Sequence, residues 1–292
     1  MKIRVATASF LMEDSEHTVQ QNLDRAVQYV RDAAEQQAEI ILLPESVTTN
    51  GTQSPIDEAS HSQGWTLFFA DIAKKHEITV IAPFFASEGN KRFNQTTVFS
   101  STGDILGYYR KAQPTGIEAQ RITPGSDFPI IDLGFAKIGI MICMDIYFPE
   151  IARIYAMKGA DILFWPTTTH GPTQHGLEAQ LRSRAIDNSL WIVESNLAGH
   201  APYAPYSGRF YPGNARVVDF NGDIVAQTGR RGGIAVYDID LSERRKTQDV
   251  FLINNPDDTR ADLEALVRID LYAKEYASLA EKQKRYYDSI TR

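Results

Sequence analysis

Short apolar runs alternate with amphipathic segments through the first third of the chain. The predicted elements are, in order, a strand at 3–10 (IRVATASF), a helix at 15–37, a strand at 39–44 (EIILLP), a helix at about 62–75 and a strand at 78–85 (ITVIAPFF). In the first helix, the apolar residues recur at helical spacing. This β-α-β-α-β order predicts helices packed against a sheet.

The middle of the chain carries two hairpin patterns. FNQTTVFS and DILGYYRK flank a turn at Thr102-Gly103, and the second of these strands ends at Lys111. ARVVDF and DIVAQTG flank Asn221-Gly222, which is one of the strongest short hairpin signals. Both pairs predict antiparallel strands.

Between the hairpins the alternation of strand and helix resumes. The predicted elements are the strand AKIGIMIC, a helix at 149–158, the strand DILFWP, a helix at about 175–188 and the strand LWIVESN. Hairpins mixed with β-α units predict an α/β protein with two mixed β-sheets between helical layers, and not a simple doubly wound sheet.

The pattern lapses after residue 245, and no domain linker is visible before that point. Residues 257–288 are rich in Ala, Leu, Glu, Lys and Tyr and predict one or two helices. We therefore expect a domain at 1–245 and a C-terminal helical extension at 246–292. The apolar residues of this extension must dock on its own domain or on a partner subunit.

Composition narrows the function classes. The chain has 292 residues and a formal net charge of −7, and without a basic block nucleic acid is a poor candidate partner. Its single cysteine excludes an internal disulfide and suits a reducing compartment, which favours a cytoplasmic location. We see no apolar run long enough to span a bilayer, so no membrane partner is expected.

Cys143 is the first candidate for chemistry, because it lies where an apolar strand ends and a helix is about to begin. A helix N-terminus stabilises a thiolate, and backbone N–H groups in such a turn can bind an oxyanion. On spacing alone, the commoner reading is a small buried hydrophobic residue.

Two charged residues could assist a thiol. Glu45 follows the apolar strand at 39–44, where α/β folds place their sites, and could act as a base. Lys111 ends a predicted strand and could stabilise an oxyanion. Each residue taken alone also fits a solvated position at the end of a strand.

The six histidines suggest neither an evident partner for the thiol nor a metal site. His170 and His175 are close in sequence, but the chain has no HExxH pattern and we identify no further ligands. Motifs of serine hydrolases and nucleotide-binding loops are also missing.

Taken together, the segments resemble the nitrilase superfamily of carbon-nitrogen hydrolases over residues 1 to about 240. LLPES carries the family's base at Glu45, YYRK its lysine at Lys111, and MICMDIYFPEIAR its nucleophile at Cys143. The segment IEAQRITPG is similar to the loop with a second glutamate, here Glu118. KGADILFWPT and LRSRAIDNSLWIVESN resemble its later motifs.

The resemblance implies a four-layer α-β-β-α sandwich, commonly assembled as a homodimer or higher homo-oligomer, with a C-terminal arm often exchanged between subunits. It implies that Glu45 takes the thiol proton, that Cys143 attacks the substrate carbonyl, and that Lys111 with the Met144 backbone N–H stabilises the oxyanion. A thioester forms and water releases the acid, with Glu118 positioning the water. No cofactor or metal is required.

The family acts on small-molecule amides, carbamoyl compounds and nitriles. True nitrilases usually carry Cys-Trp-Glu at the nucleophile, whereas this chain has Cys143-Met144-Asp145, which is more similar to the amidase and carbamoylase branches. We therefore expect hydrolysis of a small linear amide or N-carbamoyl compound, releasing ammonia or an amine. The candidate substrate contacts are Tyr147, His170, Asn196 and Tyr206.

Three other functions stay open at this point. A nitrilase would convert a nitrile to an acid with the same three residues. An acyl-transfer enzyme would pass the thioester to an amine. A non-catalytic scaffold of the same fold would retain the residues without using them.

Overall fold

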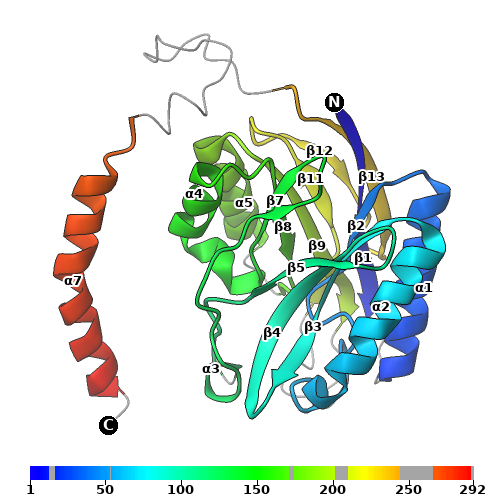
Figure 1. Ribbon diagram of the computed structural model, residues 1–292, viewed down its shortest axis with the longest axis horizontal. Coiled ribbons are helices and arrows are strands. Elements are labelled where there is room, and N and C mark those ends of the chain that lie inside the picture. The colour runs from blue at the N-terminus through cyan, green and yellow to red at the C-terminus, as the bar shows by residue number, and fades with distance from the viewer. Residues whose placement is uncertain are drawn as a thin grey trace. The chain divides into compact units, whose positions relative to one another are not determined.

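Figure 1 shows the protein as a computed structural model. The structure describes residues 1–12, 17–52, 54–116, 118–170, 174–200, 210–243 and 266–290. The chain divides into two compact units, Met1–Arg245 and Lys246–Arg292. The first holds all the described strands, and the second holds the helix α7 (Ile269–Ile290).

The described strands join into one large mixed sheet of thirteen strands. Its main path runs β5-β4-β3-β2-β1-β9-β8-β7-β6, and β10 to β13 pair off this path. The bounds are β1 (Lys2–Met12), β2 (Ile40–Leu42), β3 (Thr79–Glu88), β4 (Lys91–Phe99), β5 (Ile105–Arg110), β6 (Ile131–Asp132), β7 (Lys137–Ile140), β8 (Ile162–Pro166), β9 (Trp191–His200), β10 (Phe210–Pro212), β11 (Arg216–Val218), β12 (Ile224–Gln227) and β13 (Gly233–Asp240).

The strand β9 connects the two halves of this sheet. Its first half, from Trp191 to Ser195, pairs in parallel with β8 and, in part, antiparallel with β11. Its second half, from Asn196 to Gly199, pairs in parallel with β1. The N-terminal strand therefore meets the second half of the domain through β9, and its other partners are β2 and β13.

Helices pack on the sheet through apolar faces. Their bounds are α1 (Val19–Glu35), α2 (Ser62–His76), α3 (Glu118–Arg121), α4 (Pro149–Met157) and α5 (Gln174–Asn188), with short 3₁₀ turns at η1 (Asp57–His61) and η2 (Cys143–Tyr147). Thr18 and Gln21 form a capping box that starts α1. Pro149 begins α4, as its fixed φ favours at a first helical turn.

Three apolar clusters form most of the core. One joins α1 and α2 to their side of the sheet, and includes Val30, Phe69 and Phe84. A second contains side chains from both halves of the sheet, such as Val5 and Phe164. The third lies between α4, α5 and the sheet. Complete burial of one such large side chain contributes about 1.5–3 kcal/mol.

Both hairpin predictions are confirmed. β4 and β5 pair antiparallel around a turn in which Gly103 has φ of +87°, and β11 pairs with β12 across Gly222, at φ of +84°. Such positive φ angles favour glycine. A bilayer-spanning helix is not found in the part of the chain that the structure describes.

Candidate functional site

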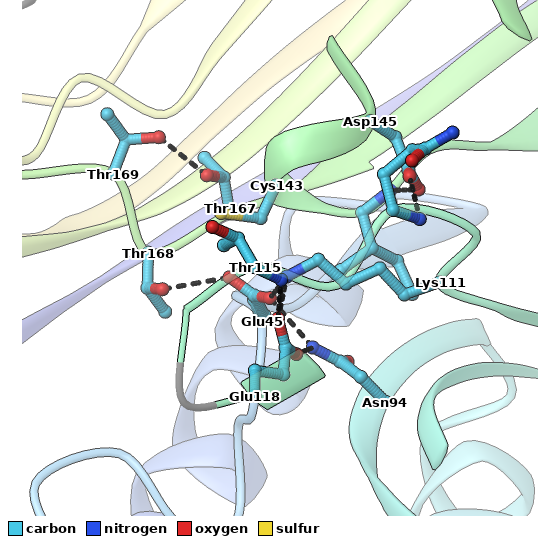
Figure 2. Close-up of polar contacts among 12 residues, drawn as sticks. Glu45, Asn94, Lys111, Thr115, Glu118, Cys143, Asp145, Thr167, Thr168 and Thr169 are labelled. Atoms are coloured by element: carbon cyan, nitrogen blue, oxygen red, sulfur yellow. Dashed lines mark hydrogen bonds and ion pairs between the residues drawn. The ribbon is translucent and has the colours of Figure 1, made fainter. Parts of the chain in front are cut away.

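Four predicted site residues come from four separate elements and meet at one place (Figure 2). Glu45 lies just beyond β2, and Lys111 directly follows β5. Cys143 begins the 3₁₀ turn after β7, and Glu118 begins α3. Glu45, Lys111 and Cys143 each follow a strand, and side chains beyond the ends of neighbouring strands can face a common site at the edge of the sheet.

Lys111 is the centre of the cluster. Its Nζ lies 3.0 Å from Glu45 Oε1 and 2.9 Å from Glu118 Oε2, and its side chain is only 2% exposed. Burial alone would lower the pKa of Lys111, but the charges of Glu45, Cys143 and Glu118 raise that pKa well above its usual value. Lys111 is therefore a fixed cation at neutral pH.

Glu45 is held by three donors. Its Oε1 accepts hydrogen bonds from Lys111 Nζ at 3.0 Å and Asn94 Nδ2 at 2.8 Å, and its Oε2 accepts one from Thr168 Oγ1 at 2.8 Å. Burial favours the neutral acid, but the Lys111 charge and these hydrogen bonds lower the pKa of Glu45 below its ordinary value. Glu45 is therefore a carboxylate at neutral pH and can accept a proton.

Asn94 connects the two carboxylates. Its Nδ2 lies 2.8 Å from Glu45 Oε1 and 2.8 Å from Glu118 Oε1. Since Lys111 also contacts both carboxylates, Glu45 and Glu118 are held together by one ammonium and one amide. These donors offset the repulsion that two adjacent anions would otherwise have.

Cys143 lies in strained backbone beside this cluster. Its φ is +46°, a left-handed conformation that costs a non-glycine residue about 1–2 kcal/mol. The indole Nε1 of Trp165 donates to the Cys143 carbonyl oxygen at 3.0 Å and helps to hold this conformation. Such strain is typical of sites where a turn presents a side chain for chemistry.

The Cys143 thiol is protonated at neutral pH, which differs from the thiolate that the sequence suggests. Burial, followed by the charge of Glu45, raises the pKa of Cys143 to about 12, although Lys111 and the Thr167 hydroxyl act in the opposite direction. The helix α4 begins at Pro149, as the sequence predicts, and the 3₁₀ turn η2 separates it from the sulfur. The thiol therefore needs a base.

The remaining predicted contacts have varied positions. Met144 follows the nucleophile in the same 3₁₀ turn, and Tyr147 ends that turn with 44% exposure. Asn196 is buried and its Oδ1 accepts from the Leu197 N–H at 2.8 Å. The His170 ring lies 5.9 Å from that of Tyr211. Tyr206 lies outside the residues that the structure describes.

Sequence reasoning missed three polar residues of the site. Asn94 lies in a run that reads only as a strand, and Thr167 and Thr168 follow the strand DILFWP as ordinary loop residues. Their hydroxyl and amide groups are common in such positions, so no local signal distinguishes them. Only the pairing of distant strands brings them to Glu45 and Cys143.

The described residues contain no cluster of three or more His, Cys, Asp or Glu side chains suited to a metal ion. The groups that meet at the site are instead a thiol, a buried carboxylate and a buried ammonium. This set can support nucleophilic attack by sulfur with proton transfer to the carboxylate and charge stabilisation by the ammonium. The fold and site thus define a cysteine-dependent hydrolase.

Comparison with known proteins places that class within a family. The model of the carbon-nitrogen hydrolase family matches residues 6–249, and the chain belongs to this family. Human omega-amidase NIT2 is 30% identical over 260 residues, which cover 80% of this chain and 91% of the relative. The citrullinase of Francisella tularensis is 30% identical over 254 residues, which cover 80% of this chain and 87% of the relative.

A solved structure gives the same fold. An amidase from Nesterenkonia sp. AN1, with acrylamide added at its active-site cysteine, matches with a TM-score of 0.79 and 23% identity. The match covers 93% of this chain and 99% of that chain. The predicted α/β class is therefore confirmed, as is the predicted enzyme class of carbon-nitrogen hydrolase.

Proposed function

We propose that this protein hydrolyses the C–N bond of a small linear amide or N-carbamoyl compound through a thioester on Cys143. The observation that carries the proposal is the meeting of Glu45, Lys111 and Cys143, three residues far apart in the sequence, at one buried cluster. The omega-amidases and the citrullinase among the relatives support amide and ureido substrates, and the relatives named as a probable nitrilase and a nitrilase homologue keep nitriles as the alternative.

In the first half-reaction, Glu45 removes the thiol proton while the sulfur attacks the substrate carbonyl. This step needs a base, because the pKa of Cys143 lies at about 12 and leaves no resting thiolate at neutral pH. Glu45 is the carboxylate that can take this role. Lys111 and the Met144 N–H stabilise the oxyanion of the tetrahedral intermediate. Glu45 then returns the proton to the leaving nitrogen, and ammonia or an amine departs.

In the second half-reaction, water attacks the thioester. Glu45 accepts a proton from this water, and Glu118, which shares Lys111 and Asn94 with Glu45, positions it. The acid is released and the thiol regains its proton. Tyr147, His170, Asn196 and Tyr206 are the candidate contacts for the rest of the substrate.

The proposal also covers the architecture, the domain organisation, the assembly and the location of the protein. The three apolar clusters support an α-β-β-α sandwich, in which two parts of the one mixed sheet would form the inner layers in place of the two separate sheets that the sequence predicts. Residues 1–245 would be the hydrolase domain, and 246–292 an extension that docks on the domain or on a partner subunit of a homodimer or larger homo-oligomer. The single cysteine fits a cytoplasmic location.

The test replaces Cys143 with Ala and measures ammonia release from a panel of amides, N-carbamoyl compounds and nitriles. We expect the wild type to turn over amides or carbamoyl compounds, and the variant to lose this activity while keeping its circular dichroism spectrum. An acyl adduct on the wild-type protein, trapped by acid quenching and seen by intact mass spectrometry, would identify the thioester.

The alternatives give different results in the same assay. Nitrile turnover above amide turnover would identify a nitrilase. Equal activity of wild type and Cys143→Ala would remove Cys143 from the mechanism, and a wild type inactive on all three classes would favour a scaffold.

A further inference from the structure

A buried carboxylate outside the Glu45 cluster joins two segments of the site. Asp145 is fully buried, and its Oδ2 accepts hydrogen bonds from Tyr109 Oη and from the Ile142 N–H, both at 2.8 Å. Its Oδ1 accepts from the Gln113 N–H at 3.0 Å. Tyr109 Oη in turn accepts from the Ala112 N–H at 3.1 Å. Asp145 belongs to the same 3₁₀ turn as Cys143, and Figure 2 labels it together with Lys111 and Cys143.

These contacts surround the two residues that matter most for chemistry. The donors at residues 109, 112 and 113 lie on both sides of Lys111. On the other segment, residues 142 and 145 lie on both sides of Cys143. A single carboxylate and a single phenol thus link the backbone that carries the ammonium to the backbone that carries the sulfur.

We propose that Asp145 and Tyr109 are positioning residues, which fix the Lys111 ammonium relative to the Cys143 sulfur during the reaction. The proposal rests on the proposed function. Lys111 can stabilise an oxyanion on a substrate bound to sulfur only if its Nζ lies at the correct place when that charge develops. Small misplacements of such groups are costly, since a shift of about 1 Å can reduce the rate on the order of 100-fold.

The protonation of Asp145 adds a measurable signature. Burial raises the pKa of Asp145 to about 6, although hydrogen bonds from Ile142, Tyr109 and Gln113 and the Lys111 charge lower it in part. Among the described residues, Tyr155 on α4 also interacts with the charge of Asp145, and burial raises the pKa of both tyrosines, so neither ionises near neutral pH.

Below about pH 6 the Asp145 carboxyl gains a proton and loses acceptor capacity, so its hold on the Lys111 segment weakens. Glu45 cannot cause the same effect, because the Lys111 charge and its hydrogen bonds lower the pKa of Glu45 below its ordinary value, despite burial. We therefore expect kcat to fall on the acid side with a midpoint near pH 6, well above the pH at which Glu45 is protonated.

Two matched variants test the proposal. Tyr109→Phe removes the hydroxyl that binds Asp145. Tyr155→Phe removes a hydroxyl from an equally buried neighbour, whose ring is edge-on to that of Tyr109 with the two ring centroids 6.4 Å apart. We expect Tyr109→Phe to lower kcat roughly 10-fold or more, with KM within about threefold. Its acid limb should move to higher pH, because a hydrogen bond that favours the carboxylate is lost.

Tyr155→Phe serves as the control, and its kcat and acid limb should stay close to those of the wild type. The positioning role would be overturned if the two variants lost kcat equally, if only KM changed, or if the acid limb of Tyr109→Phe stayed in place. A wild type inactive on all C–N substrates would instead contradict the proposed function, and the positioning role with it.

Discussion

At the residue scale, the charge balance of the site decides its chemistry. A buried carboxylate, Glu45, and a half-buried one, Glu118, share the ammonium of Lys111. Burial and the charge of Glu45 raise the pKa of Cys143 most, and the charge of Glu118 adds to them, so the thiol stays protonated. The resting site therefore holds a thiol and not a thiolate. In the proposed mechanism, Glu45 removes the thiol proton only when the sulfur attacks the substrate.

Glu118→Gln tests this arrangement. The new amide would present an N–H group to Lys111 or to Asn94, both of which are donors, so Lys111 would lose one anchor. We expect kcat for amide hydrolysis to fall roughly 10- to 100-fold. The measurement is steady-state ammonia release at neutral pH.

The matched control is Glu88→Gln, which removes a carboxylate that pairs with Arg110 at 2.8 Å on the surface. Its side chain is 68% exposed, so its loss should leave kcat unchanged. If Glu118→Gln behaved like this control, Glu118 would have no part in the reaction.

The sequence predicts only part of this site at the residue level. Glu45, Lys111 and Cys143 each end or follow a recognisable strand, and their shared order resembles a family, so the sequence alone identifies them. It does not identify Asn94 and Thr168, because an amide within a strand and a hydroxyl in a loop have many ordinary uses. Their role depends on which strands become neighbours.

At the element scale, a buried ion pair connects β9 to the strand beside it. Glu194 on β9 is 2% exposed, and its Oε2 lies 2.7 Å from Arg216 Nε on β11. Arg216 also reaches Glu178 on α5 at 2.9 Å. Burial raises the pKa of Glu194 to about 7, despite the opposing charge of Arg216.

This shift makes stability depend on pH. Between about pH 4.5 and 7 the folded protein binds more protons at Glu194 than the unfolded chain does, so the free energy of unfolding falls as pH rises through this window. We expect Glu194→Gln to lack this component of the slope, whatever its absolute stability. Urea unfolding at several pH values from 4.5 to 8 measures the slope.

Glu178→Gln is the control for that experiment. Burial acts to raise the pKa of Glu178, but the hydrogen bonds and charges of Arg182 and Arg216 together lower it, so its stabilising effect is already complete above its ordinary pKa. Because the charge of Glu178 also helps to raise the pKa of Glu194, its variant should keep a slope of the same sign between pH 5 and 7, but a smaller one than the wild type. An unchanged slope in Glu194→Gln would show that Glu194 is ionised throughout.

Predictions of helices, strands and turns succeeded where the backbone preferences of local residues determine the structure. They failed where tertiary contacts determine it. Asn221-Gly222 and Pro149 fix a turn and a helix start by their own backbone preferences, and both lie as predicted. The segment after β7 reads as a strand that leads into a helix, yet a 3₁₀ turn intervenes. The burial of Asp145 and its hydrogen bonds produce that turn, and both depend on tertiary contacts.

At the scale of the whole molecule, the four clustered residues lie within one compact unit. Glu45, Lys111, Glu118 and Cys143 belong to residues 1–245, and the family match ends at residue 249. A chain that ends after Asp249 should therefore keep a kcat close to that of the intact chain, because it retains all four clustered residues and the whole family match. Ammonia release per folded chain is the measurement.

Light scattering on the same truncated protein reports the role of the extension. A smaller assembly with unchanged kcat would indicate that residues 250–292 bind a partner subunit. Loss of kcat in a folded truncated chain would contradict the expectation and would mean that the extension contributes to catalysis.

The pairing of β9 with both β8 and β1 also affects how the protein folds during its synthesis. The ribosome releases β1 early, but its neighbours β9 and β13 follow only after most of the domain has been translated. At about 5–20 residues per second, this delay is on the order of tens of seconds. During that time a long apolar edge of the nascent protein has no permanent neighbour, so its yield in cells should depend on chaperones that shield such edges.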